Sequence, residues 1–382
     1  MPPAQGESLQ IEKMSLVEVI GRVWEVLTRR IDSFLFGCAL VLFGVGLATL
    51  FSAADQSTAR MSSQLLSFAL ALVLMWIVAN VPPQTLARAA VPLYVAGVLL
   101  LLGVAFFGVV VNGSRRWLNV GVARIQPSEL MKIALPLMLA WYFQKFEGRI
   151  NWKDFAMAAV LIAVPVYLIK RQPDLGTALL LGASGFYVLF LAGLSWKIIA
   201  GMAAVGGAAG PLLWSQLHDY QRERILTFLD PSRDPLGAGY HSMQASIAIG
   251  SGGVIGKGWL NGTQTHLDFL PERHTDFIFA VFGEEFGLIG AALLLLLYML
   301  LIGRALVITA NASTLFARLL AGAVTLMFFT YAFVNMGMVS GLLPVVGVPL
   351  PLMSYGGTAL VSIFIGLGVL MSVHAHRTFV QT

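Results

Sequence analysis

Carboxylates are spaced unusually in the stretch Phe269–Gly287, which reads FLPERHTDFIFAVFGEEFG. Asp276 opens a long apolar run, and Glu284 and Glu285 lie inside that run. A carboxylate can serve as a general base, and a nearby Arg or Lys keeps it ionised. Read as one helix, the stretch places Asp276 in the positively polarised first turn, with Thr275 as the cap. The two glutamates then lie about 12 Å deeper, where we expect them to pair with buried groups on neighbouring helices or to mark a polar cavity.

A second acidic residue with a basic neighbour occurs in the stretch RRWLNVGVARIQPSELMK, Arg115–Lys132. Pro127 suits the first position of a helix, so Glu129 falls in the first turn and Lys132 lies three residues later on the same face. A capped and paired helix start would explain this pattern without any chemistry.

A third carboxylate, Asp174, lies in the stretch KRQPDLGTA. Pro173 and Gly176 interrupt the backbone between two apolar segments, which places Asp174 at a helix mouth next to Lys170 and Arg171. A plain turn explains the proline and the glycine, but it explains an acid facing lipid less well.

The stretch NMGMVSGLLPVVGVPLPLMSYGGTA contains too many prolines and glycines for a continuous helix, among them Pro344, Gly356 and Gly357. It carries no titratable acid or base, so we expect a structured loop that dips against a helical bundle and shapes the wall of a cavity.

Glu129, Asp174 and Asp276 are all predicted at helix mouths on one face of a membrane. That face also concentrates basic residues, which a simple orientation rule would not predict and which indicate an anionic ligand at the membrane surface. A carboxylate can act as a base while Arg and Lys hold a phosphate-bearing leaving group. The basic residues on this face are Arg115, Arg116, Arg124, Lys132, Lys170, Arg171, Arg222, Arg224, Arg233, Lys257 and Arg273.

The composition identifies a membrane protein, because 58% of the residues are hydrophobic and 11% are charged, against about 25% charged in soluble domains. Stretches near the ~20 residues that cross a bilayer predict about ten spanning helices in one integral membrane domain, residues 1–382. The predicted spans are Phe34–Leu50, Leu65–Val81, Val91–Val111, Leu130–Phe143, Phe155–Ile169, Ala178–Gly193, Ile198–Trp214, Phe277–Ile302, Leu315–Val339 and Ala359–Val373.

Two polar segments complete the predicted organisation. Residues 1–31 form a cytoplasmic segment whose apolar stripe within Ser15–Arg30 is typical of an in-plane amphipathic helix. Residues 215–275 form a long extracytoplasmic connection between the seventh and eighth spans, with enough internal pattern for a folded cap. The basic flank Arg29 and Arg30 favours a cytoplasmic N-terminus.

No His or Cys residues stand at zinc-motif spacing, and the single cysteine, Cys38, rules out an internal disulfide. The sequence is compatible with a divalent cation, Mg²⁺ or Mn²⁺, that bridges carboxylate and phosphate. We expect no nucleic-acid partner.

These same four stretches resemble the SEDS family of shape, elongation, division and sporulation proteins, over Asp32 to Val373. The wording GKGWLNGTQTHLDFLPERHTDFIFAV and GVPLPLMSYGGTA is closer to the elongation branch than to the division branch. The resemblance implies a ten-helix enzyme of the bacterial inner membrane with both termini in the cytoplasm. It also implies polymerisation of lipid II into glycan strands, undecaprenyl-linked glycan as a substrate, and work with a class B penicillin-binding protein and other elongation-complex proteins.

Carried over to this sequence, the resemblance makes Asp276 the essential aspartate, and we predict it to be the general base. Arg115, Arg116, Lys132 or Arg273 would hold the diphosphate, while Glu129 and Asp174 would orient those cations or bind a metal. Trp117 joins the predicted substrate-binding residues. Glu284, Glu285, Pro344, Gly356 and Gly357 are predicted to build the cavity.

Three alternatives remain at this point. A flippase or ion-coupled carrier would place its site near the midplane on broken helices, and only Glu284 and Glu285 favour that location. A scaffold that recruits a penicillin-binding protein through the eighth and ninth spans would leave the outer carboxylates without a task. A polymerase of the division type would share the chemistry and differ in cellular role.

Overall fold

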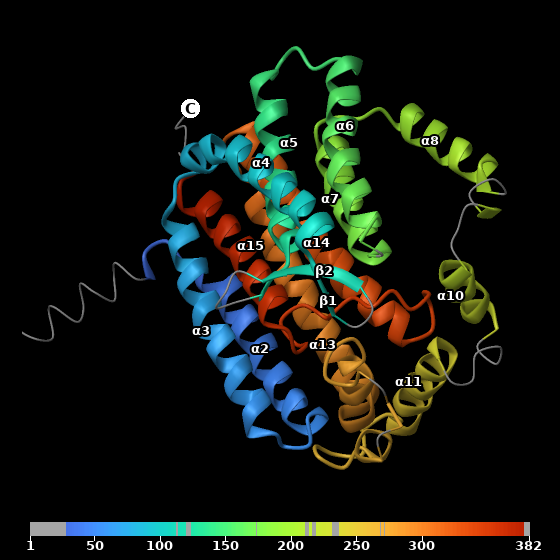
Figure 1. Ribbon diagram of the computed structural model, residues 1–382. Helices are drawn as coiled ribbons and strands as arrows, with labels where there is room; N and C mark the ends of the chain where they lie inside the picture. The colour runs from blue at the N-terminus through green and yellow to red at the C-terminus, as the bar shows by residue number, and fades with distance from the viewer. Residues whose placement is uncertain are drawn as a thin grey trace, which may run out of the picture.

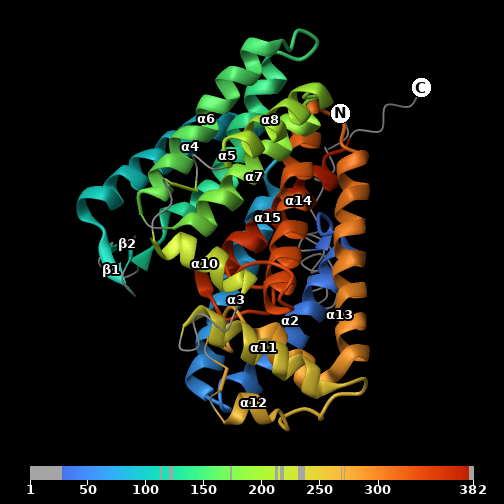
Figure 2. The same ribbon diagram turned by 90° about the vertical axis from the view of Figure 1, so that its right-hand side faces the viewer.

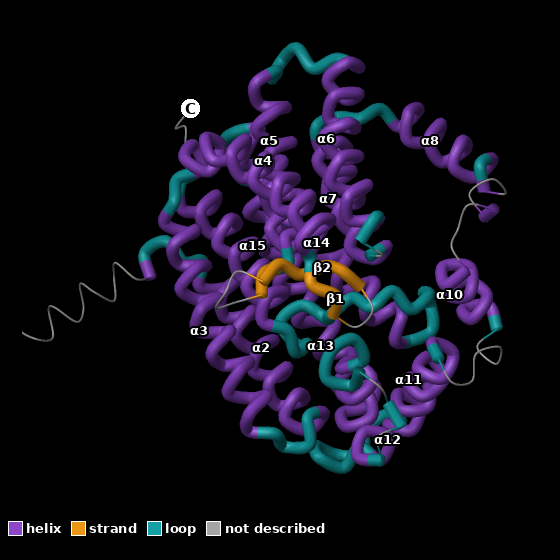
Figure 3. Tube along the Cα trace, in the orientation of Figure 1, coloured by secondary structure: helices purple, strands orange, loops and turns teal. Residues whose placement is uncertain are grey.

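The computed structural model describes residues 28–111, 114–119, 124–172, 174–210, 214–215, 219–230, 237–267, 269–270 and 272–377. The predicted amphipathic stripe at residues 16–27 lies outside them. Within the described residues the protein is a bundle of long helices with a small sheet lying across it (Figures 1 and 3).

Each of the ten predicted spans overlaps one helix, as apolar composition and length require. Seven of the described helices are long and apolar enough to cross a membrane, and α7 and α8 are shorter apolar helices. None of the thirteen residues of α8 is buried, and α8 stands apart from the bundle in Figure 1. The ten helices are α2 (Ser33–Ala53), α3 (Thr58–Asn80), α4 (Pro83–Phe107), α5 (Pro127–Lys145), α6 (Trp152–Lys170), α7 (Leu175–Leu191), α8 (Trp196–Ala208), α13 (Ile278–Ala310), α14 (Leu315–Val339) and α15 (Gly357–Ala375).

A three-stranded antiparallel sheet follows α4, in the order β1 (Val109–Val111), β2 (Ser114–Asn119) and β3 (Arg124–Ile125). The third predicted span was therefore too long, because α4 ends at Phe107 and β1 begins two residues later. Trp117 pairs with Val109 across the first ladder. The sheet thus fixes the backbone of the segment that carries Arg115, Arg116 and Trp117.

The predicted long connection contains three described helices, α10 (Asp219–Leu229), α11 (Ala238–Gly252) and α12 (Thr263–His266). α11 packs against the beginning of α13, and both lie at the end of the molecule where α12 is found (Figure 2). The part of the connection that contains α11 and α12 is therefore folded onto the bundle, in agreement with the predicted folded cap.

Helix α13 is broken at Gly287, where φ is 65° and ψ is −163°. The glycine-rich segment after α11 bonds to both sides of the break, with Lys257 N donating to Glu284 O at 3.0 Å and Leu288 N donating to Gly253 O at 3.0 Å. A Cβ on Gly256 would lie 2.2 Å from the Glu285 carbonyl oxygen, so only glycine permits this approach. Two chain segments therefore cross backbone against backbone.

Two predictions about the stretch Phe269–Gly287 are wrong. The eighth span is not one continuous helix, and its strongly exposed apolar side chains begin at Leu288, so Glu284 and Glu285 precede the lipid-facing part. The N-cap of α13 is Phe277, which makes no side-chain cap bond. Thr275 therefore does not cap this helix, although it was predicted to do so.

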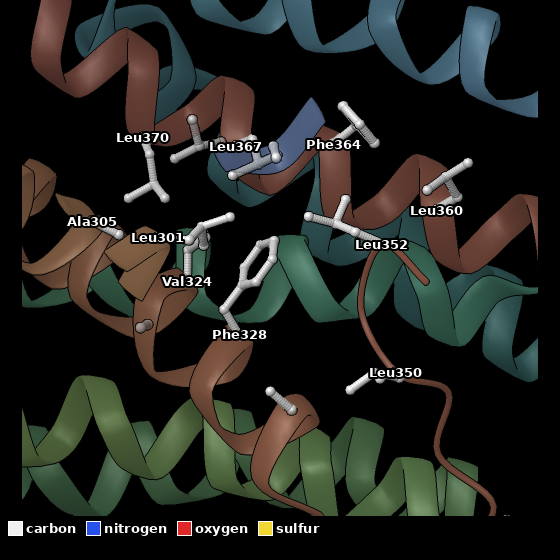
Figure 4. Packing of buried hydrophobic residues seen from close by; sticks show 14 of the residues in the cluster. Leu301, Ala305, Val324, Phe328, Leu350, Leu352, Leu360, Phe364, Leu367 and Leu370 are labelled. Carbon is white, nitrogen blue, oxygen red and sulfur yellow. The ribbon is translucent and has the colours of Figure 1, made fainter. Parts of the chain in front are cut away.

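The core gathers around α14. Phe328 of α14 points between helices α13 and α15 toward Leu301, Leu352 and Leu367 (Figure 4), and it is 6% exposed. Leu350 and Leu352 belong to the proline-rich loop before α15 and are almost fully buried. Burial of these side chains anchors the loop in the bundle, which fixes the wall that the loop presents on its other side.

Candidate active site

A cleft of about 610 Å³ opens between the bundle and the proline-rich loop, and it collects most of the predicted site residues. Several of these residues begin a helix or precede one, so the backbone of each is fixed by the element that follows. The lining residues are Ser63, Ser67, Arg116, Trp117, Gln126, Glu129, Lys132, Asp174, Leu175, Gly176, Thr177, Leu180, Thr275, Asp276, Tyr331, Val346, Gly347, Val348, Pro349, Tyr355, Gly356, Gly357, Thr358 and Ala359.

Asp276 lies in the turn that leads into α13 and is partly buried. Its side chain faces the proline-rich loop, because a Cβ on Gly347 would lie 3.2 Å from Asp276 Oδ2. A glycine at this position, with φ 76°, lets the loop approach the carboxylate closely. The arrangement leaves a carboxylate on the wall of a cleft, where a substrate hydroxyl can reach it.

Lys132 and Glu129 form the predicted ion pair on α5, with 2.6 Å between Lys132 Nζ and Glu129 Oε1. Ser362 of α15 donates to the other carboxylate oxygen at 2.6 Å. Lys132 Nζ also lies 4.9 Å from the ring centre of Tyr331 on α14. Since an ammonium group has three donors and one of them is directed to Glu129, this nearly buried lysine can still donate to an anion in the cleft.

Asp174 caps α7, where its Oδ1 accepts from Thr177 N at 3.1 Å. Its other oxygen lies 3.4 Å from Arg116 Nη1 of β2. The predicted neighbours were Lys170 and Arg171, but the cation that approaches Asp174 comes from the sheet. Arg171 instead donates to the Tyr167 hydroxyl at 3.0 Å.

Three predicted residues lie outside the lining of the cleft. Arg115 is exposed and its Nη1 lies 3.4 Å from the Ala105 carbonyl oxygen. Arg273 is 8% exposed, donates to the Thr265 carbonyl and is ion-paired with Asp55. Pro344 belongs to the same loop as Gly356 and Gly357, but only the two glycines line the cleft.

The two buried glutamates are also outside the cleft lining and serve other contacts. Glu284 Oε1 accepts from Lys257 Nζ at 2.7 Å and from Gln264 N at 3.0 Å. Glu285 accepts a bond from Ser52 of α2. Of the two roles predicted for them, the contacts favour pairing with neighbouring elements.

The sequence interpretation missed several polar residues of the lining. Ser63 and Ser67 lie one turn apart on α3, and Tyr331 projects from α14. The available signal was a polar side chain inside an apolar helix, which is expensive in a membrane and therefore informative.

Oxygen ligands would suit a divalent cation, and three carboxylates line the cleft. Within the described ranges, however, no group of three or more His, Cys, Asp or Glu residues is close enough to hold a metal ion. Glu129 and Asp174 already face cationic partners. The residues present do not form a ready metal site, and the predicted cation stays a prediction.

The model of the FtsW, RodA and SpoVE family of cell cycle proteins matches residues 30–379 of the chain. The chain belongs to this family. It is the SEDS family that the four stretches resemble, so the resemblance is confirmed.

Relatives of this SEDS protein include the peptidoglycan glycosyltransferase MrdB of Escherichia coli strain K12, which is 50% identical over 339 residues, 88% of this chain and 92% of MrdB. Among solved structures, a chain of a peptidoglycan synthase complex that coordinates polymerization and crosslinking matches with a TM-score of 0.80 and 34% identity, over 91% of this chain and 99% of that one. The rod shape determining protein RodA of Thermus thermophilus matches with a TM-score of 0.69 and 32% identity, over 91% and 97%. The predicted polytopic SEDS fold is thereby confirmed.

Proposed function

We propose that this SEDS protein is a peptidoglycan glycosyltransferase that polymerises lipid II into glycan strands and releases undecaprenyl diphosphate. One observation carries the proposal: a single cleft holds Asp276 together with the cations Lys132 and Arg116. The relationship to MrdB supports the same activity, and the relationship to MrdB and RodA supports a role in elongation and cell shape.

In the proposed reaction, the 4-hydroxyl of one lipid-linked glycan attacks the anomeric carbon of another, with inversion. A glycosidic C–O bond forms, the bond from that carbon to the diphosphate breaks, and Asp276 takes the hydroxyl proton. Lys132 and Arg116 bind the diphosphate and stabilise the charge that develops on it. Glu129 and Asp174 hold these two cations in place, and Trp117 offers an apolar ring to a sugar.

In this proposal the cleft opens at the outer face of the inner membrane. Arg304, near the end of α13, joins Asp32 before α2, and His374 near the end of α15 lies 3.4 Å from the same carboxylate. These contacts place both described chain ends at one end of the bundle, while α11 covers the opposite end of α13. With the termini in the cytoplasm, the helix starts that carry Asp276, Asp174 and Glu129 face outward.

The transport alternative is less well supported by this geometry. A carrier places its site near the midplane on broken helices, whereas the three carboxylates of the cleft precede or begin α13, α7 and α5. The glutamates that favoured transport are engaged with α2 and with the segment around α12.

A class B penicillin-binding protein is the proposed partner. An apolar groove of about 400 Å³ runs between α13 and α14, lined among others by Ala291, Leu295, Met299 and Phe333. Such a groove suits a single apolar helix that crosses the membrane beside the bundle, because small residues let helices approach closely.

The decisive experiment supplies lipid II to the purified protein, alone and with its penicillin-binding partner. Asp276→Ala should lower the polymerisation rate by about 10²–10⁴-fold, because it removes the base. Glu147→Gln, at an exposed acid on the turn after α5, is the matched control and should polymerise as wild type does. Normal glycan chains from Asp276→Ala, or none from wild type with any partner, would refute the proposal.

A further inference from the structure

Three consecutive backbone carbonyls, those of His274, Thr275 and Asp276, all accept hydrogen bonds from other parts of the chain. Tyr355 N donates to His274 O at 2.9 Å, and Ser354 Oγ donates to Thr275 O at 2.6 Å. The side-chain amide of Asn335 donates to Asp276 O at 2.8 Å. The backbone on which Asp276 stands is therefore tied, residue by residue, to elements that follow it by about sixty to eighty positions.

Asn335 is a fully buried amide near the C-terminal end of the apolar helix α14, where it is 0% exposed. Its Nδ2 has two N–H donors, and each finds a carbonyl: Asp276 O at 2.8 Å and Val348 O at 2.6 Å. One rigid side chain thus bridges the two walls of the cleft, since Asp276 and Val348 both line it.

The proline-rich loop is held from a second side by Gln64 of α3, which is 2% exposed. Gln64 Nε2 donates to Ser354 O at 3.3 Å, and Gly356 N donates to Gln64 Oε1 at 3.3 Å. Ser354 also accepts from Leu350 N at 2.8 Å while it donates to Thr275 O. The loop is therefore braced on α3 by Gln64, and Asn335 ties the same loop and Asp276 to α14.

Asn335 is absent from the residues that line the cleft. A substrate in the cleft therefore meets Asp276 and Val348, and Asn335 acts only through them. Catalytic groups must be held close to their productive geometry, and an error of about 1 Å can lower a rate by about 10²-fold. A buried donor that fixes the base is a means to reach that tolerance.

We propose that Asn335 is a positioning residue for glycan polymerisation, which sets the distance between Asp276 and the Val346–Pro349 wall by bonding to both backbones. The inference rests on the proposed role of Asp276 as general base. It assigns a function to a residue of α14 that does not line the cleft and whose two hydrogen bonds both go to backbone carbonyls.

The test uses the full-length protein with its penicillin-binding partner and compares two substitutions on α14. Asn335→Leu keeps the size of the side chain and removes both donors. Thr325→Val is the matched control, because Thr325 is also 0% exposed and polar, but it bonds to Ala321 O and Thr309 of the core. Initial rates over a range of lipid II concentrations give kcat and KM for each variant.

Asn335→Leu should lower kcat by about 10–100-fold with KM within about twofold of wild type, because the base is displaced and the binding groups are not. Thr325→Val should keep the wild-type kcat. A wild-type kcat for Asn335→Leu, a loss confined to KM, or an equal loss in Thr325→Val would each overturn the inference.

Two further variants keep the result interpretable. Ser354→Ala removes the two hydrogen bonds of the Ser354 hydroxyl, to Thr275 O and from Leu350 N. It should lower kcat less than Asn335→Leu does. It also tests the support of the Asp276 backbone if Asn335→Leu does not fold. Asp276→Ala, measured in the same series, separates the two proposals. If Asp276→Ala polymerises normally, the proposed function fails; if it is inactive while Asn335→Leu and Ser354→Ala are normal, only the positioning role fails.

Discussion

Lys132 owes its place in the cleft to three side chains from three helices. Glu129 neutralises it on α5, Ser362 orients Glu129 from α15, and the ring of Tyr331 covers the ammonium from α14. A buried ammonium group without such partners would be costly in a membrane. If Lys132 binds the diphosphate as proposed, these contacts hold its charge in position before substrate arrives, which is how preorganised charge stabilises a transition state.

Removal of the Lys132 charge tests whether this side chain binds the diphosphate. Lys132→Met keeps the length of the side chain and should lower kcat for lipid II polymerisation by about 10²–10³-fold, the usual loss when one charge-stabilising group is removed. Lys153→Met, at an exposed lysine near the start of α6, should leave kcat unchanged. The measurement is the initial rate with saturating lipid II, and a rate near wild type for Lys132→Met would exclude it from diphosphate binding.

Local spacing predicted this pair but could not predict the partners of the other acids. Glu129 and Lys132 are three residues apart, so the helix alone brings them together. Arg116 of β2 reaches Asp174 across 58 positions of the chain, and no periodicity encodes that contact. Asn335 was likewise invisible as a partner of Asp276, since it sits in another predicted span.

The break in α13 is explained by its neighbour, the Gly253–Gly258 segment. The lengths of the apolar stretches predicted spans that each overlap a helix, because apolar length is the main requirement for crossing a bilayer. Apolar length could not show the break, because the backbone contacts at the break come from a different segment of the chain, Gly253–Gly258. The glycine-rich run after α11 was predicted only as part of the folded connection, and the close backbone approach gives its glycines a specific role.

Substitution of Gly256 tests this crossing of segments. Gly256→Ala would place a Cβ 2.2 Å from Glu285 O at a φ of 87°, so it should destabilise the protein by about 1–3 kcal/mol. Gly303→Ala on the straight part of α13 is the control, because among the described residues nothing lies within 4 Å of its added Cβ. Thermal unfolding in detergent should show a lower Tm for Gly256→Ala alone. Equal Tm values would mean that the segment yields without strain.

Asp32, which precedes α2, connects two helices at the end of the bundle opposite α11. It accepts a hydrogen bond from Arg304 Nη2 of α13 at 2.5 Å. Burial by itself would raise the pKa of Asp32, but the hydrogen bonds from Arg304 and Leu35 N hold the pKa below its ordinary value. A carboxyl whose pKa is depressed on folding stabilises the protein above its unfolded pKa of about 4, and this stabilisation is lost as the pH falls through the lower, folded pKa.

Asp32→Asn should therefore lower the free energy of unfolding at pH 7 by about 1.5–3 kcal/mol, the usual contribution of a hydrogen bond to a charged group. The difference from wild type should narrow as the pH falls below about 4. Glu147 has no buried partner among the described contacts, so the free energy of unfolding of Glu147→Gln should equal that of wild type at every pH. Thermal unfolding from pH 7 to pH 3 measures this, and a difference that does not change with pH would show that the charge of Asp32 is not its source.

Three parts of the molecule have different predicted roles: the end that holds the chain termini, the cleft and the apolar groove. The chain ends are fastened at Asp32, the cleft lies between the bundle and the proline-rich loop, and the groove of α13 and α14 faces sideways with apolar walls. Asn335 and Phe333 are two residues apart on α14, so the same helix braces Asp276 and lines the groove. A partner helix seated in that groove contacts the element that positions the proposed base.

Filling the groove should therefore separate partner binding from chemistry. Ala291→Trp places a large ring in the groove and should abolish copurification of the penicillin-binding protein, while polymerisation by the protein alone stays at its own basal rate. Leu99→Trp is the control, because Leu99 of α4 is already 62% exposed, and this variant should retain the partner. Copurification together with the rate of lipid II polymerisation, with and without partner, measures both effects. Retention of the partner by Ala291→Trp would place the docking surface on another face, because a helix cannot share a groove with an indole ring that already fills it.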